Sequence, residues 1–374
     1  MSNMICHLDI RRDFPAPVQP QYTIERWQNG LAVRMPNWLG DAVMALPALR
    51  QLKRIVPEGC ALGVITPASL EIFYRSLPWV DLILPLESAH RNWSYMEIQN
   101  LRRFTPGAGV LFNNSFRDAW MMRRGRVHHL YGTDARFRSF LMKGTFHFPK
   151  RHDRELHQIH HANRYLAMAS ALGAPAWDGT LPEIEIVRPR IQLPETIRVL
   201  CDHPRLLVLA AGGAYGAAKR WKNEHYRQVA QNWIDQDGIV ITVGSPSEAP
   251  IGEEILQGLP REYACNMMGK TDLAELMHLL QRARGVVAND SGVMHLAAAL
   301  GRPGVAVFGS TDYTATGPIH PGWEILYAGV DCAPCFCRVC PKAPAECMEK
   351  ITADMVTASL QRVTASSGTQ SSAS

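Results

Sequence analysis

An aspartate and a glycine lie where an expected strand ends and an expected helix begins. The stretch MPNWLGD, residues 35–41, leaves an apolar run and enters a helical pattern of apolar residues. Gly40 would let the backbone approach a ligand closely, and the carboxylate of Asp41 could take a proton from a hydroxyl group. The alternative is that Asp41 only caps the helix, as aspartate often does at a strand-to-helix turn.

A second candidate is the stretch AAGGAYGAAKRW, which directly follows the first expected strand of the second half. It contains Gly212, Gly213 and a further glycine, followed by two cations of which Lys219 is the first. Glycines and cations at a strand end can hold a phosphate, but the spacing fits neither the Walker A pattern nor the dinucleotide fingerprint. A glycine-rich surface turn with solvated cations is the alternative.

A third candidate is the stretch ANDSGVMHL, where an apolar strand ends and a helix of small residues begins. Backbone N–H groups around Ser291 and Gly292 would bind an anion there, aided by the helix dipole. A serine hydrolase is disfavoured, because the residue two before the serine is not the glycine that a nucleophile elbow needs. The alternative is an N-cap at Asp290 or Ser291 and a half-buried His295 with its polar contacts satisfied.

Cysteines are crowded near the end of the chain, where five of the nine lie between residues 332 and 347. In a cytosolic protein such crowding indicates metal binding before it indicates disulfides. Four thiolates could close a tetrahedral zinc or iron site. The alternative is a loop of free, partly buried thiols. The candidate ligands are Cys332, Cys335, Cys340 and Cys347.

Short β-branched runs alternate with helical patterns in two successive series. This alternation predicts βαβ units with parallel sheets, and hence an α/β fold. Ligands bind beyond the carboxyl ends of the strands in such sheets, where the first three motifs lie. Strands are expected at 31–35, 62–66, 82–85 and 110–112, and again at 206–210, 239–243, 285–288 and 305–308.

The chain divides into two expected domains. Three prolines and weak periodicity between residues 188 and 204 indicate a linker. The last residues are small or polar and should be disordered. We therefore expect an N-terminal extension at 1–30, a first domain at 31–190, a linker at 191–203, a second domain at 204–365 and a tail at 366–374.

Composition favours a cytoplasmic protein with two cores. The chain has 374 residues, 47% of them hydrophobic, which is enough for two domains. No apolar run opens the chain, and the most apolar stretch, 286–308, is broken by charged residues. We therefore expect neither a signal peptide nor a membrane anchor. A net charge of only +5 disfavours a nucleic-acid binder.

Cations and histidines are concentrated between residues 117 and 164. An anionic partner could bind this basic stretch, and a solvated charged face is the alternative. The candidate contacts are Arg117, Arg123, Arg136 and Arg138.

Taken in order and spacing, these motifs resemble glycosyltransferase family 9, the heptosyltransferases. The similarity spans most of the chain, and it is carried by the stretches at 34–49, 269–273, 289–292 and 308–311. The resemblance implies a GT-B fold, in which two Rossmann-like α/β/α domains face each other across a central cleft. It also implies an inverting transfer of heptose from ADP-heptose without a required cofactor.

The resemblance assigns roles to residues that match the family's motifs. Asp41 becomes the general base, and Lys219 and the turn at 290–292 bind the donor diphosphate. Glu248 is implied as a ribose or adenosine contact. The other donor-binding positions are Gly40, Gly212, Gly213, Thr271 and His295.

The implied acceptor is the inner core of lipopolysaccharide, which is lipid A bearing anionic Kdo sugars and a first heptose. The basic stretch suits such an acceptor, and membrane contact would then be peripheral, on the cytoplasmic face of the inner membrane. Two alternatives stay open. One is a related transferase with another nucleotide sugar or acceptor, such as an O-antigen or protein heptosyltransferase. The other is a non-catalytic protein that binds a nucleotide sugar or glycan.

Overall fold

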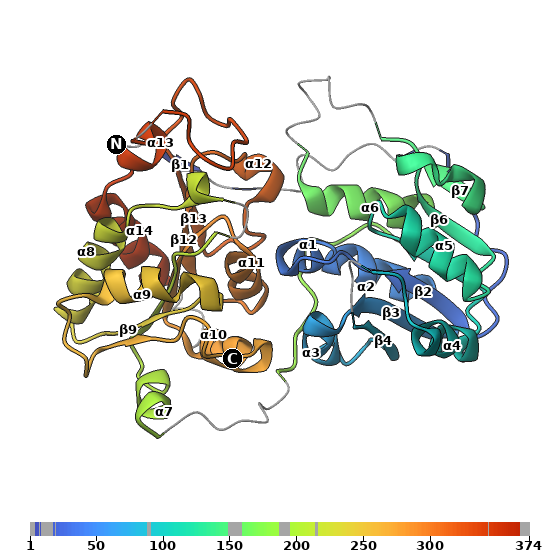
Figure 1. Ribbon diagram of the computed structural model, residues 1–374, viewed down its shortest axis with the longest axis horizontal. Helices are drawn as coiled ribbons and strands as arrows, with labels where there is room; N and C mark the ends of the chain where they lie inside the picture. The colour runs from blue at the N-terminus through green and yellow to red at the C-terminus, as the bar shows by residue number, and fades with distance from the viewer. Residues whose placement is uncertain are drawn as a thin grey trace. The chain divides into compact units, whose positions relative to one another are not determined.

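The chain forms two compact units, which we call the N-terminal and the C-terminal unit. The N-terminal unit is Ile10–Val187, and the C-terminal unit is Arg188–Ser374 together with Met1–Asp9. Figure 1 shows helices packed around a sheet in each unit. The computed structural model describes residues 4–6, 8, 18, 20–87, 91–148, 159–186, 195–213, 216–342 and 344–366.

The N-terminal unit is built on a parallel sheet in the order β4-β3-β2-β5-β6-β7. The order reverses between β2 and β5, which is the switch point where Rossmann-type sheets bind ligands. The strands are β2 (Gly30–Arg34), β3 (Ala61–Pro67), β4 (Leu82–Leu86), β5 (Ala108–Leu111), β6 (His129–Thr133) and β7 (Gly144–Phe146).

Helices of the N-terminal unit form two packed groups. One group contains α1, α2 and α6, and the other contains α4 and α5. Ser94 and Glu97 start α4 with a capping box, which satisfies backbone N–H groups of its first turn. The helices are α1 (Leu39–Met44), α2 (Leu46–Ile55), α3 (Glu71–Arg75), α4 (Tyr95–Phe104), α5 (Phe116–Arg124) and α6 (His161–Ala171).

The C-terminal unit repeats this topology in the order β1-β13-β12-β11-β8-β9-β10. The switch point lies between β8 and β11, and the short β1 (Ile5–Cys6) adds an antiparallel edge to β13. Residues near the start of the chain thus complete the second sheet, which a simple N-terminal extension does not predict. The other strands are β8 (Leu206–Ala210), β9 (Ile239–Thr242), β10 (Ala264–Asn266), β11 (Gly285–Asn289), β12 (Gly304–Phe308) and β13 (Trp323–Tyr327).

Helices α8, α9 and α14 lie on one side of this sheet, and α10 and α11 lie on the other (Figure 1). A helix, α7, lies where only a linker was expected. The helices are α7 (Glu195–Cys201), α8 (Asn223–Ile234), α9 (Ala249–Leu256), α10 (Leu273–Arg282), α11 (Gly292–Ala299), α12 (Tyr313–Thr316), α13 (Glu346–Glu349) and α14 (Ala353–Ser366).

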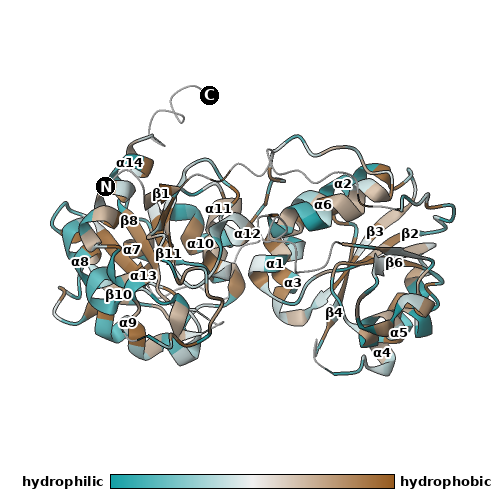
Figure 2. Ribbon diagram, turned by 90° about the horizontal axis from the view of Figure 1, so that it is seen from above, coloured by the Kyte–Doolittle hydropathy of each residue, from teal (hydrophilic) through white to brown (hydrophobic). Residues whose placement is uncertain are grey.

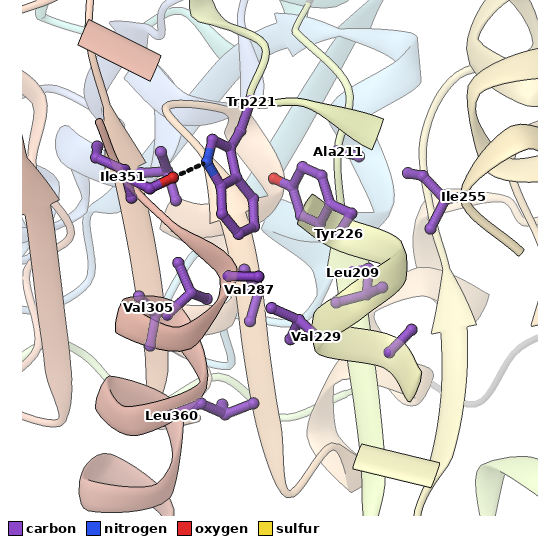
Figure 3. Close-up of a cluster of buried hydrophobic side chains, with 14 of the residues drawn as sticks. Leu209, Ala211, Trp221, Tyr226, Val229, Ile255, Val287, Val305, Ile351 and Leu360 are labelled. Atoms are coloured by element: carbon purple, nitrogen blue, oxygen red, sulfur yellow. Dashed lines mark hydrogen bonds between the residues drawn. The ribbon is translucent and has the colours of Figure 1, made fainter. Parts of the chain in front are cut away.

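A buried cluster joins these helices to the sheet (Figure 3). Trp221 and Tyr226 pack edge to face, with ring centroids 4.9 Å apart. The buried indole of Trp221 donates its N–H to the carbonyl of Ile351, 2.8 Å away, so its polar atom is satisfied. Figure 2 shows apolar strands such as β3 and β11 inside the units and hydrophilic residues on α8.

Two further expectations concern the ends of the chain and the membrane. Within the described residues, no helix has both the length and the apolar character needed to cross a bilayer. The expected tail at 366–374 lies outside the described residues except for Ser366, which ends α14. Most of the expected extension at 1–30 before residue 20 also lies outside them.

Candidate functional site

The C-terminal unit brings two of the sequence motifs together at its switch point. The glycine-rich stretch follows β8, and the Asn289–Gly292 stretch follows β11. These strands are parallel neighbours whose last paired residues are Ala210 and Ala288. Both motifs therefore leave the same edge of the sheet at adjacent positions, where a ligand of this fold would bind. Ala214 and Tyr215 of the glycine-rich stretch lie outside the described residues.

Asn289 connects the glycine-rich loop to the loop that follows β11 through hydrogen bonds of its side chain. Its amide donates to the carbonyl oxygens of Ala211, 2.7 Å away, and Gly212, 3.2 Å away. Its side-chain oxygen accepts from the backbone N–H of Trp221 and the hydroxyl of Tyr226. The side chain is fully buried. Because all these bonds point into the protein, Asn289 fixes the shape of the site without reaching a ligand.

Lys219 and Asp290 form an ion pair at this site. The Lys219 Nζ lies 2.6 Å from Oδ2 of Asp290, which also accepts a bond from the Thr311 hydroxyl at 2.8 Å. Both charged side chains are largely buried, so the pair holds the ammonium group in one place. A carboxylate repels phosphate, so Asp290 could serve an anion site only by orienting the ammonium group of Lys219.

Ser291 caps α11, the helix that follows β11. Its extended backbone ends the preceding turn, and its hydroxyl accepts from the N–H of Met294 at 3.4 Å. The first N–H groups of a helix have no intrahelical acceptor, so those of Gly292 and its neighbour are available to an anion. His295 lies in the next turn of the helix and is buried. It therefore fits the structural alternative better than direct contact with a phosphate.

Glu248 holds the glycine-rich loop against the loop that follows β9. Its carboxylate accepts from the N–H of Gly213 and from the N–H and hydroxyl of Ser245, all at 2.8 Å. A Cβ on Gly212 would lie 2.3 Å from Oε1 of Glu248, so any larger residue here would displace this carboxylate from its bonds. Gly213 has no such restriction. The carboxylate is buried and bonded to the protein, and a ribose contact stays a prediction.

Thr271 lies beyond β10, at the edge of the same sheet. Strands β10 and β11 are three positions apart, which is roughly 14 Å at the usual strand spacing. The strand order therefore separates Thr271 from the strand ends that carry Lys219 and Ser291. A contact would need the far end of an extended ligand.

In the N-terminal unit, Asp41 lies in the first turn of α1, directly beyond β2. Residue Trp38 occupies the N-cap position, and no side chain caps this helix end. No hydrogen bond therefore supports the alternative in which Asp41 caps the helix. Gly40 lies directly before Asp41 in the same helical turn. The Asp41 carboxylate is one-third exposed, so a substrate hydroxyl could reach it.

Two residues of α6 surround this carboxylate, and sequence reasoning missed both. Nδ1 of His161 lies 3.8 Å from Oδ1 of Asp41. Tyr165 is half-buried, and desolvation, followed by the nearby Asp41 carboxylate, raises its pKa well above the ordinary value. His161 belongs to the basic stretch in sequence, but the fold places it beside the candidate base.

A buried ion pair lies beneath the Asp41 turn. Nε of Arg34, the last residue of β2, is 2.9 Å from Oδ2 of Asp118, and neither side chain is exposed. Burial lowers the pKa of Arg34, and the Asp118 carboxylate opposes this effect. Asp118 also accepts from Trp93 and from Asn113. The pair therefore joins β2 to α5 across the switch point.

Arg34 continues from this pair into the turn that carries Asp41. It donates to the side-chain oxygen of Asn37 at 2.6 Å and to the carbonyl of Met35. Through these bonds the network fixes the start of the turn. No sequence motif indicated it. The available signal was a charged residue within an otherwise apolar strand, GLAVR.

The four arginines expected to bind the acceptor differ in exposure. Arg136 is exposed, and Arg117 and Arg123 are partly exposed. Arg138 is fully buried, and its guanidinium donates to Thr133 and to backbone oxygens of residues 113 and 115. The expectation for Arg138 is therefore wrong in this structure, because its head group is buried and bonded inside the unit. Residues 149–158 of the basic stretch lie outside the described residues.

In the part of the chain that it describes, the structure does not show the expected metal site. Among the described residues, no three or more His, Cys, Asp or Glu side chains are grouped so as to hold a metal ion. Cys332 is exposed, the thiol of Cys340 contacts the carbonyl of Lys342, and Cys347 is buried. Burial, followed by the nearby thiols of Cys332, Cys340 and Cys335, raises the pKa of Cys347, so the four predicted ligands are neighbours that do not form such a group.

The cysteine-rich segment nevertheless supports the glycine-rich loop and the loop that follows β12. The carbonyl of Arg338 accepts from the N–H of Ala218, next to Lys219, at 3.0 Å. The N–H of Phe336 donates to the carbonyl of Ser310 at 2.7 Å, next to the threonine that binds Asp290. The segment thus braces both sides of the Lys219–Asp290 pair.

The sequence of this chain is similar to those of known heptosyltransferases. A family model described as glycosyltransferase family 9 (heptosyltransferase) matches residues 98–346. Lipooligosaccharide heptosyltransferase 2 of Haemophilus influenzae is 30% identical over 311 residues, which are 78% of this chain and 86% of that protein. Lipopolysaccharide heptosyltransferase 2 of Escherichia coli K12 is 28% identical, covering 76% and 84%.

A solved structure is also similar over nearly the whole chain. The E. coli ADP-heptose lipopolysaccharide heptosyltransferase II gives a TM-score of 0.71 at 23% identity, covering 90% of this chain and 99% of that one. The fold class is thus the one expected from the sequence, α/β of the GT-B type.

Proposed function

Because this chain belongs to glycosyltransferase family 9, the heptosyltransferases, we propose that it transfers heptose from ADP-L-glycero-D-manno-heptose to the inner core of lipopolysaccharide. The acceptor in this proposal is lipid A that carries Kdo and a first heptose, so the enzyme acts as a heptosyltransferase II. Relatives with that name match about three quarters of the chain, which supports this choice of acceptor. The reaction takes place on the cytoplasmic face of the inner membrane.

The observation that carries the proposal is the Lys219–Asp290 pair beside the capped start of α11. An oriented ammonium group and helix N–H groups can stabilise the charge that develops on the β-phosphate as ADP leaves. These groups supply the stabilisation without a metal ion or other cofactor. The N-terminal unit contributes Asp41, whose carboxylate takes the proton from the acceptor hydroxyl as the glycosidic bond forms. A single displacement then inverts the anomeric carbon.

An assay of donors and acceptors tests this function. The purified protein is incubated with ADP-heptose, UDP-sugars or GDP-sugars, and with core acceptors that carry one heptose or none. We expect mass spectrometry to show one added heptose only with ADP-heptose and the heptosylated acceptor. Turnover with another donor or acceptor would make the protein a related transferase. Tight ADP-heptose binding without turnover would make it a binding protein.

Substitution of Lys219 tests the diphosphate site. Lys219→Ala should weaken the binding of ADP and ADP-heptose by ~1.5 to 3 kcal/mol, the range for a charge-assisted hydrogen bond. The loss also leaves Asp290 without its partner, so its negative charge would repel the phosphates. Calorimetry measures both affinities. Lys222→Ala, which removes a cation paired with Glu349 near the surface, is the control and should bind ADP normally. Unchanged ADP affinity in Lys219→Ala would contradict the assignment.

Arginine variants test the acceptor site. Arg117→Ala, Arg123→Ala and Arg136→Ala should raise the acceptor KM and leave kcat nearly intact, because they remove binding common to the ground and transition states. The acceptor KM should also rise with ionic strength, while donor binding responds less. Arg138→Ala should instead lower the melting temperature, since its bonds are internal. Three wild-type KM values without salt dependence would place the acceptor elsewhere.

A further inference from the structure

Helix α5 and the two short helices that pack against it expose four aromatic side chains with no role in the proposed chemistry. The exposed fractions are 94% for Phe137, 73% for Phe140, 46% for Trp120 and 40% for Phe116. Phe116 and Trp120 are one helical turn apart on α5, and the rings of Phe116 and Phe140 have centroids 6.1 Å apart. Helix α5 packs against the short helices Ala135–Phe137 and Ser139–Leu141. We call these four side chains the aromatic patch.

The elements that present the aromatic patch are anchored in the core. Leu141, the neighbour of Phe140, is buried, as are Met121 and Met122 of α5. The exposure of the rings therefore does not come from a loosely packed segment. The backbone of Arg136 and Phe137 is left-handed, with φ of 56° and 55°. This conformation is rare for bulky residues and costs energy, so it indicates a function for the outward-pointing ring.

Cations surround the aromatic patch. Arg117 and Arg124 flank Trp120 on α5, and Arg136 precedes Phe137. The nearby carboxylate of Asp118 is buried and paired with Arg34, and it also lies 3.4 Å from Nε of Arg117, so it offsets part of the charge of Arg117 but not that of Arg124 or Arg136. Asp134 is an exposed acid here, and it contacts His147. The surface thus combines exposed rings with an excess of positive charge.

The aromatic patch lies at the same edge of the sheet as Asp41. Asp41 follows β2, Phe116 follows β5, and the two short helices follow β6. These strands are parallel and consecutive in the sheet, about 5 Å apart, so their carboxyl ends lie side by side. A partner that binds the aromatic patch would therefore lie beside the candidate base.

We propose that the aromatic patch and its arginines dock the N-terminal unit on an anionic phospholipid surface. Phenylalanine rings have no polar group and gain from burial at the headgroup boundary, while the arginines are attracted to anionic headgroups. A glycan is less suited to the two most exposed rings, because at 73% and 94% exposure they project outward from the unit. The link to catalysis rests on the proposed function, since a lipid-linked acceptor would be presented at this surface.

Vesicle flotation tests the docking without donor or acceptor, so its result does not depend on the proposed function. The probes are phosphatidylcholine vesicles with and without an equal share of phosphatidylglycerol. We expect the protein to bind the anionic vesicles, with a partition coefficient that falls as salt is added. The double variant Phe137→Asn, Phe140→Ser should bind at least ~10-fold less. Asparagine tolerates the left-handed backbone at position 137, so the variant should keep its melting temperature.

The control is Tyr263→Ser, which removes a ring of 43% exposure from the C-terminal unit and should bind vesicles normally. Equal binding by wild type and double variant would overturn the proposal. So would a wild-type dimer that the double variant breaks, because the occupant would then be a second copy of the chain. If transfer is measurable, the double variant should raise the KM for vesicle-embedded acceptor at least ~10-fold and leave a deacylated acceptor unaffected. An equal loss with both acceptors would assign the rings to the glycan.

Discussion

Asp41→Asn is expected to lower kcat by at least ~100-fold, the usual contribution of a positioned general base. The amide keeps the shape of the side chain but cannot take a proton from the acceptor hydroxyl. Donor affinity should change little, because the groups that we assign to the diphosphate lie in the C-terminal unit. Steady-state kinetics with ADP-heptose and a heptosylated core acceptor measures kcat, and calorimetry measures donor affinity.

Two comparisons separate a catalytic role for Asp41 from a structural one. Asp41 makes no cap bond at the start of α1, so the melting temperature of Asp41→Asn should match the wild type. Asp178→Asn removes an exposed carboxylate of the same unit that pairs with Arg54, and it should keep normal turnover. If Asp41→Asn turns over at a near-normal rate, the general base lies elsewhere.

All eight strands predicted from the sequence are present, but β6, β7, β10 and β13 were not predicted. Strands β6 and β13 have the sequences HLYGT and WEILY, in which polar or charged residues interrupt the apolar run. Strands β7 and β10 have three residues each, which is too short for periodicity to identify. The pairing of β1 with β13 joins positions such as Ile5 and Leu326, and only tertiary contact determines it. The parallel arrangement of both sheets was expected from the alternation of elements, because parallel strands need helical crossovers. The Rossmann-like order was implied by the family resemblance.

Within the site, the sequence predicted residues that belong to short local motifs, but it did not predict partners that are distant along the chain. Lys219 and Ser291 stand in short stretches at strand ends, where glycine and a helix start already indicate an anion site. Their relation to each other depends on β8 and β11 being neighbours. Asp41 was visible for the same local reason, but His161 comes from a helix that begins 120 residues later. A single sequence gives no signal for that approach.

Arg34 gave a partial signal, since a charge in a fully buried strand needs a partner. Its partner, Asp118, is 84 residues away, so the sequence could not identify it. Asp118 lies in sequence among the arginines of the basic stretch. From the sequence alone, such an aspartate would be expected on the surface, where it would partly neutralise the neighbouring arginines. The fold instead uses it inside the unit.

The Arg34–Asp118 pair leads to the second prediction with a large expected effect. Asp118→Asn should reduce the free energy of unfolding by about 3 to 5 kcal/mol, because the guanidinium of Arg34 would remain buried without a compensating charge. Asparagine keeps the volume of aspartate, so the loss would not come from a cavity. Urea unfolding of both proteins measures the difference. Glu71→Gln, which breaks the surface pair with Arg75, should cost no more than ~1 kcal/mol.

A double-mutant cycle with Arg34→Met identifies the origin of the loss. If the buried charge pair is responsible, the two substitutions together should cost at least ~2 kcal/mol less than the sum of their separate effects. Additive effects would instead assign the loss to the bonds that Asp118 accepts from Trp93 and Asn113. Because Arg34 also holds Asn37, folded Asp118→Asn should lose kcat while its ADP affinity stays normal. Normal kcat in that variant would show that the pair stabilises the unit without positioning the Asp41 turn.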